Sequence, residues 1–153
     1  MNTLLLLLAL NISSYNNDIS TIRTLYLSAY TNESNCNHFG EKLMSIQDEE
    51  NVLIKGYKGC FYFIKCKFIN NPISKFIYFN KGKELLESAI QTDPNSIELR
   101  FLRYTIQKNI PRFLLYYDNI EKDLKFVNEN LNKTTNKDIK NFILTSITSI
   151  NKQ

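Results

Sequence analysis

Apolar residues recur along the chain at intervals of three and four, a pattern that predicts a succession of amphipathic helices. The most apolar stretch covers residues 52–69, where the repeating positions are Leu53, Tyr57, Cys60, Ile64 and Phe68. Residues at this spacing share one face of a helix, so the stretch predicts a helix with one buried side.

The same spacing predicts further helices over about 18–29, 35–46, 73–91, 97–110, 118–131 and 139–150. Pro72 is well placed at a first helical position, and Asp118 is a candidate cap for the helix that follows it. The last stretch is rich in Ile and Thr, so a strand there is the alternative. We therefore expect an all-α fold of six or seven helices stacked as antiparallel hairpins.

Composition supports one helical domain. The chain has 153 residues, about the size of a single domain, and 43% of them are hydrophobic. Its 4 Gly and 3 Pro are few for a β fold built from many tight turns. The three cysteines, Cys36, Cys60 and Cys66, are too few for a disulfide framework and are expected to be small core residues.

The beginning of the chain has its own pattern. An unbroken apolar run extends from Leu4 to Leu10 and is followed by Ser13 and Ser14. The run is shorter than a membrane span needs and suits a signal peptide over residues 1–14, which leaves a helical domain over 15–153. This predicts a periplasmic or secreted protein. If the run is not cleaved, it becomes a core helix of a cytoplasmic protein. No other stretch is long enough to span a membrane.

Two stretches resemble known proteins. Gly82, Ala89 and Pro94 have the spacing of the second helix and closing turn of a tetratricopeptide repeat, and Gly56 and Gly59 resemble the small position on its first helix. The resemblance covers about residues 52–110 and implies a helical hairpin with a concave partner-binding side. The separation of Gly59 from Ala89 exceeds that of the repeat, which predicts longer helices or a longer turn.

The whole chain also resembles a group of bacterial helical envelope proteins. The shared features are an Asp-Pro-Asn turn at residues 93–95 and the segment Pro111-Arg-Phe-Leu114. This resemblance implies an envelope location and supplies no activity.

Together these features predict a non-enzymatic protein that binds a protein or peptide partner or acts as a scaffold. The chain has one histidine, His38, and carries neither a nucleophile elbow nor a glycine-rich phosphate loop, so no catalytic set can be assembled. The cysteine spacing does not suit zinc, and neither a metal nor a cofactor is expected. The candidate partner-binding residues are Lys55, Lys58, Tyr62 and Lys65 on the concave side, with Arg100 and Arg103.

Each candidate set has an alternative interpretation. Arginine forks suit carboxylates, but Arg100 and Arg103 could instead pair within the chain with Glu98, Asp118 or Glu121. Residues 51–83 carry no acidic residue and interleave aromatic rings with seven lysines: Lys55, Lys58, Lys65, Lys67, Lys75, Lys81 and Lys83. Such a run can bind single-stranded nucleic acid or an anionic surface, which is the alternative function. The helical periodicity favours buried rings and solvated lysines, so nucleic acid is disfavoured.

Overall fold

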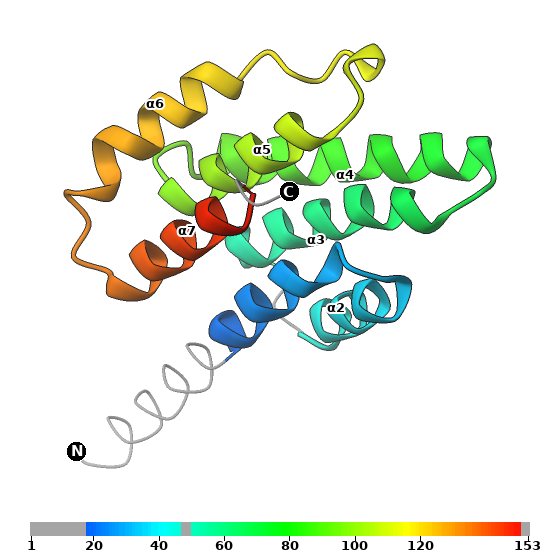
Figure 1. Cartoon of the computed structure of the whole chain (residues 1–153), viewed down its shortest axis with the longest axis horizontal. Helices are drawn as coiled ribbons and strands as arrows, with labels where there is room; N and C mark the ends of the chain where they lie inside the picture. Colours follow the sequence, from blue (N-terminus) through cyan, green and yellow to red (C-terminus); the bar gives the residue numbers. More distant parts are fainter. Residues whose placement is uncertain (1–17, 47–49, 151–153) are drawn as a thin grey trace.

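A computed structural model describes residues 18–46 and 50–150 of the chain (Figure 1). This part contains seven α-helical segments and no strand, which confirms the predicted all-α class. Residues 18–29 form the first helical segment. The other elements are α2 (Glu33–Ser45), α3 (Val52–Lys65), η1 (Cys66–Phe68), α4 (Pro72–Thr92), α5 (Ile97–Asn109), η2 (Arg112–Leu114), α6 (Ile120–Leu131) and α7 (Lys137–Ile150). The predicted signal peptide over residues 1–14 lies outside the described residues.

Side-chain caps set the starts of several helices, because the first backbone N–H groups of a helix have no partner within it. The side chains of Asn32, Asn51, Asn71 and Ser96 each accept a hydrogen bond from a backbone N–H in the first turn of α2, α3, α4 and α5. Pro72 occupies the start of α4, as predicted.

The predicted cap of α6 is wrong. Asn119, not Asp118, is the N-cap residue, and its side chain makes no capping bond. Its backbone N–H instead donates to Oε1 of Gln107 on α5 at 3.1 Å. The start of α6 is therefore set by a contact with another helix.

Helices α3 and α4 form a close antiparallel hairpin around small residues (Figure 1). A Cβ atom added to Gly59 would lie 2.8 Å from the backbone N of Leu86 and 2.9 Å from the carbonyl O of Gly82. Such distances leave no room for a side chain, so glycine at both positions lets the two backbones meet. The hairpin is present as predicted, while its membership of the tetratricopeptide repeats stays a prediction.

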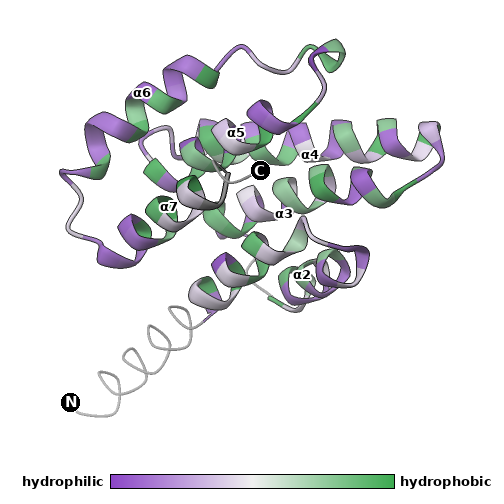
Figure 2. Cartoon of the chain, in the orientation of Figure 1, coloured by the Kyte–Doolittle hydropathy of each residue, from purple (hydrophilic) through white to green (hydrophobic). Residues whose placement is uncertain are grey.

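The core is rich in aromatic rings that meet edge to face. Tyr26 contacts Phe39, Tyr57 and Phe142 at centroid distances of 6.0, 5.7 and 6.1 Å. Phe101 contacts Phe142 at 5.9 Å. These rings come from the first helical segment and from α2, α3, α5 and α7, so they join elements far apart in sequence. Figure 2 shows α3 as mostly hydrophobic and α6 as largely hydrophilic.

Two sequence predictions about burial need correction. Cys36 and Cys60 are buried and unpaired as expected, but Cys66 is only half-buried. Periodicity predicts buried rings in residues 51–83, yet Phe76 is 65% exposed, and the neighbouring Ile73 and Ile77 are exposed as well. In Figure 1, the end of α4 that carries these residues extends past α5.

Candidate functional site

Three of the four predicted site residues on α3 make contacts within the chain. The Lys55 ammonium donates to Ser88 Oγ of α4 at 2.8 Å. The Lys65 ammonium points the other way, where it pairs with Glu33 of α2 at 2.9 Å. The Tyr62 ring contacts Tyr78 and lies under the Lys81 ammonium, 4.7 Å from the ring centroid. Lys58 is half-buried. Lys55 and Lys65 are thus engaged with two different neighbouring helices, α4 and α2, and the role of the four residues in binding a partner stays a prediction.

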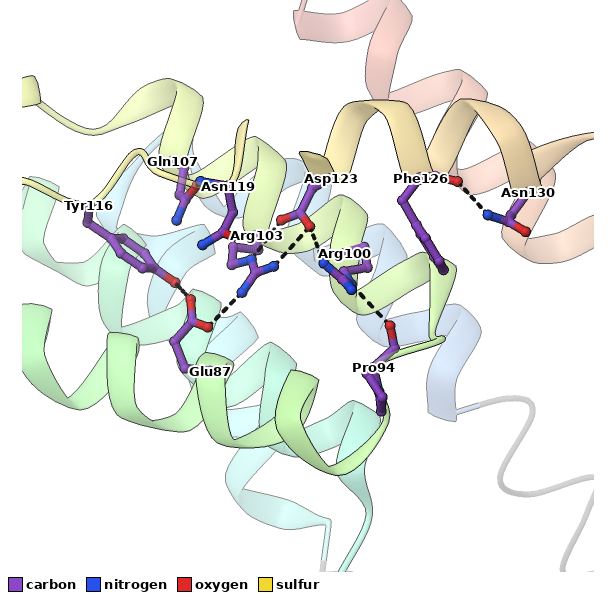
Figure 3. A network of polar contacts seen from close by, with 10 residues as sticks. All are labelled: Glu87, Pro94, Arg100, Arg103, Gln107, Tyr116, Asn119, Asp123, Phe126 and Asn130. Carbon is purple, nitrogen blue, oxygen red and sulfur yellow. Dashed lines mark hydrogen bonds and ion pairs between the residues drawn. The ribbon is translucent and has the colours of Figure 1, made fainter. Parts of the chain in front are cut away.

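Arg100 and Arg103, in contrast, do come together, on a fully buried carboxylate (Figure 3). Arg103 donates to Asp123 Oδ2 at 2.6 Å and to Oδ1 at 2.9 Å, and Arg100 donates to Oδ1 at 2.8 Å. Arg103 also pairs with Glu87 at 2.6 Å, and the Tyr116 hydroxyl donates to the other oxygen of Glu87. This network joins α4, α5 and α6.

The network answers the alternative raised for the two arginines. They pair within the chain, but with Asp123 and Glu87 instead of the three predicted acids. Burial lowers the pKa of Arg103, yet its hydrogen bond to Asp123 and the nearby negative charges hold that pKa above its ordinary value. Because Arg103 is buried and its fork is engaged, it is not available to a partner in this conformation.

A second buried network surrounds Glu98. Arg23 donates to its two carboxylate oxygens at 2.8 and 2.7 Å, and the Tyr57 hydroxyl donates to Oε1 at 2.5 Å. The first helical segment, α3 and α5 are thereby joined. Both networks are internally paired, and each is best understood as a brace between helices.

An apolar pocket of about 780 Å³ lies among the first helical segment, α3, the start of α4 and the end of α5. Leu27, Phe79 and Leu114 belong to its walls. It also reaches Ile64 and Ile106, each only 2% exposed, so it extends into the hydrophobic core. Cavities of this size and character are typical of sites for small molecules.

The hydroxyl groups deep in this pocket are already paired. Tyr26 Oη and Thr105 Oγ1 share a hydrogen bond of 2.6 Å, and Tyr26 also meets the Tyr30 hydroxyl at 3.2 Å. The Ser146 hydroxyl donates to the Phe142 carbonyl at 2.7 Å. Burial raises the pKa of Tyr26 and of Tyr30, so both remain neutral at physiological pH. The deep part of the pocket thus presents apolar surface and satisfied hydroxyls.

The mouth of the pocket differs from its interior. Phe76 and Phe113, both among the lining residues, are 65% and 79% exposed. Among the described residues that line the pocket, Lys67 and Lys75 are the charged ones, and no lining residue is acidic. Lys67 donates to the Tyr30 carbonyl at 2.9 Å. The pocket therefore has an apolar interior and a positively charged edge.

A smaller cavity of about 340 Å³ lies on another side of α5. Gln107 lines it together with Lys108 and Tyr117. The Gln107 Nε2 atom is buried and has no hydrogen-bond partner among the described residues. We assign no ligand to this cavity.

In the part of the chain that the structure describes, no helix is long and apolar enough to cross a membrane. Nor does any group of three or more His, Cys, Asp and Glu side chains there lie close enough together to hold a metal ion.

Comparison with protein-family models, curated proteins and solved structures gave no match to this chain. The resemblances to the tetratricopeptide repeat and to bacterial envelope proteins accordingly stay predictions.

Sequence reasoning did not find the pocket, although part of the signal was visible. Lys67, Lys75, Phe76 and Phe79 all belong to the basic aromatic run over residues 51–83. Phe113 belongs to the Pro-Arg-Phe-Leu segment. What the sequence did not reveal is that these two stretches meet beside the first helical segment.

Proposed function

We propose that this protein is a non-catalytic binding protein, and that its pocket holds the apolar chain of an amphipathic small molecule. The observation that carries the proposal is the 780 Å³ pocket that reaches the core. Burial of apolar surface is the main driving force for such binding. The paired, neutral hydroxyls of Tyr26, Thr105 and Ser146 support a binding role over a catalytic one.

A slender apolar chain suits this interior better than a segment of polypeptide. A peptide backbone carries N–H and C=O groups that need partners when they are buried. The hydroxyls at the bottom of the pocket already have partners, so they do not offer replacements. A protein or peptide that binds elsewhere on the surface stays a prediction, as does the alternative of nucleic acid or an anionic surface.

The proposal includes the envelope location predicted from residues 4–14. The intact mass of the natively expressed protein should then lack about the first fourteen residues. A mature protein that begins at Met1 would remove the basis for that location and leave the pocket proposal unchanged.

Binding of a neutral fluorescent probe, N-phenyl-1-naphthylamine, tests the proposal. We expect saturable binding with one site per chain and an increase in fluorescence, because the probe leaves water for an apolar cavity. The protein itself contains no Trp, which keeps the background emission low. Absence of saturable binding by the folded protein would overturn the proposal.

A matched pair of variants locates the site. Leu27 and Leu25 are half-buried leucines on the first helical segment, but Leu27 lines the pocket and Leu25 does not. We expect Leu27→Trp to fill the pocket and weaken probe binding at least tenfold, and Leu25→Trp to leave it nearly unchanged. Circular dichroism establishes that both variants are folded. Equal probe binding by the two variants would show that the probe binds elsewhere.

A further inference from the structure

The charges around the pocket are placed at one end. Lys67 belongs to η1 and Lys75 to the first turns of α4, so both lie at the turn that joins α3 and α4. Cys66, which precedes Lys67 in the chain, contacts the Lys75 carbonyl with its Sγ atom at 3.4 Å. The lining residues from α5 and α7, such as Thr105, Ile106 and Ser146, carry no charge.

Both ammonium groups still have N–H groups that can donate to an anion. Lys67 uses one proton in its bond to the Tyr30 carbonyl, and an ammonium has three. Within residues 18–46 and 50–150, neither lysine has an acidic partner. Arg23 and Arg103, by contrast, are each paired with a buried carboxylate.

We propose that the ligand is a long-chain carboxylate, with its chain in the pocket and its head group between Lys67 and Lys75. This inference rests on the proposed function and names the class of ligand. Two ammonium groups at the edge of an apolar cavity match the charge and the shape of such a molecule. A cavity of about 780 Å³ is typical of a site for one drug-sized ligand, so it favours a single chain over a two-chain phospholipid.

Displacement of N-phenyl-1-naphthylamine by two ligands of equal chain length tests the head group. The ligands are hexadecanoate and hexadecan-1-ol, each used below the concentration at which it self-associates. We expect hexadecanoate to bind at least tenfold more tightly than the alcohol. The preference should weaken with added salt, because Lys75 is solvent-exposed and its charge is screened.

Two variants assign the preference to the two lysines. We expect Lys67→Gln combined with Lys75→Gln to reduce hexadecanoate affinity about tenfold and to leave hexadecanol affinity unchanged. Lys58→Gln is the matched control, because Lys58 is a lysine of the same region that does not line the pocket. It should change neither affinity.

The outcomes separate this inference from the proposed function. If the probe and hexadecanol bind but hexadecanoate binds no more tightly than hexadecanol, the carboxylate proposal is overturned and the apolar binding site stands. The same conclusion follows if the double lysine variant weakens both ligands equally. If neither ligand displaces the probe, or the probe itself does not bind, both proposals fall.

Discussion

From its middle to the end beside α5, the α3–α4 hairpin is closed by Gly56, Gly59, Gly82 and Ala89, which let helices touch. At the turn end of the same two helices, large apolar side chains such as Phe76 face solvent beside the pocket. The difference teaches how one hairpin serves two purposes. Small residues give the close packing that stabilises the fold, and large residues at the uncovered end provide surface for a ligand.

Charges follow the same division. At the closed end, cations pair with buried carboxylates, as Arg103 does with Asp123. At the open end, Lys67 and Lys75 have no acidic partner among the described residues. Substitutions at the closed end should therefore change stability, and substitutions at the open end should change binding.

The largest effect is expected at Asp123. Asp123→Ala would leave Arg103 buried with one of its partners missing, and removal of one member of a buried ion pair costs about 3–5 kcal/mol of unfolding free energy. Urea denaturation followed by circular dichroism measures the loss. Glu129→Ala is the control, because its pair with Lys125 is exposed and 3.9 Å long and should contribute about 1 kcal/mol or less. Equal midpoints for Asp123→Ala and the unmodified protein would show that the network does not brace the helices.

A smaller effect is expected from Gly59→Ala. The added methyl group would meet backbone atoms of α4, 2.8 Å away at Leu86 N, so the helices must separate. Overpacking of this kind costs about 1–3 kcal/mol. At Gly40 the added methyl would meet the tip of the Phe61 side chain, which is half-buried and can turn aside. Gly40→Ala should therefore cost less unfolding free energy, and the higher helix propensity of alanine offsets part of that cost. If the two substitutions shift the urea midpoint equally, the hairpin is not closed by backbone contact.

These two regions also differ in how much the sequence revealed. The helices and the hairpin were predictable because periodicity, Pro72 and the small residues 82 and 89 act locally or between neighbouring helices. The partners of Arg103 were not predictable from the sequence, since Asp123 lies on a helix whose placement depends on the whole fold. Periodicity places the lysines of α3 on one face, but it did not reveal that Lys55 bonds to α4 and Lys65 to α2.

The pocket depends even more on long-range placement. Its walls join residues from Tyr26 to Ser146, and no local pattern relates these positions. Composition drew attention to residues 51–83, and periodicity then indicated that their rings are core and their lysines solvated. That interpretation holds for Phe63, which is buried, but not for Phe76, which is exposed at the mouth of the pocket.

Helix α2 also holds a buried thiol, that of Cys36, whose ionisation opposes folding. Burial raises the pKa of Cys36 to about 11, from an ordinary value of 9.0. The unfolded chain therefore loses this proton first, so the stability contribution is full below pH 9 and is lost as the pH rises toward 11. Each unit of difference between the folded and unfolded pKa of this thiol corresponds to about 1.4 kcal/mol of unfolding free energy.

Cys36→Ala isolates this contribution. The alanine variant should be less stable than the unmodified protein at pH 7, because a buried side chain is truncated, and this deficit should shrink by pH 10.5. Urea midpoints of both proteins at the two pH values give the comparison, and titration of the other groups is common to both. A deficit that is the same at both pH values would mean that the thiol ionises alike in the folded and unfolded states.

The smallest change in stability is expected at the open end, where two adjacent residues provide a matched pair. Phe76 and Ile77 are 65% and 57% exposed, but Phe76 lines the pocket and Ile77 does not. Replacement of either by Ser removes little buried surface, so each should change the unfolding free energy by no more than about 0.5 kcal/mol.

Binding should separate these two variants where stability does not. Phe76→Ser removes an aromatic ring from the mouth of the pocket, so we expect it to weaken binding of N-phenyl-1-naphthylamine several-fold, whereas Ile77→Ser should bind the probe as the unmodified protein does. The apolar area that contacts a ligand, not the exposed apolar area in general, would then determine affinity. Equal weakening by both substitutions would indicate that the whole exposed face of α4 binds apolar molecules and that the pocket has no special part in it.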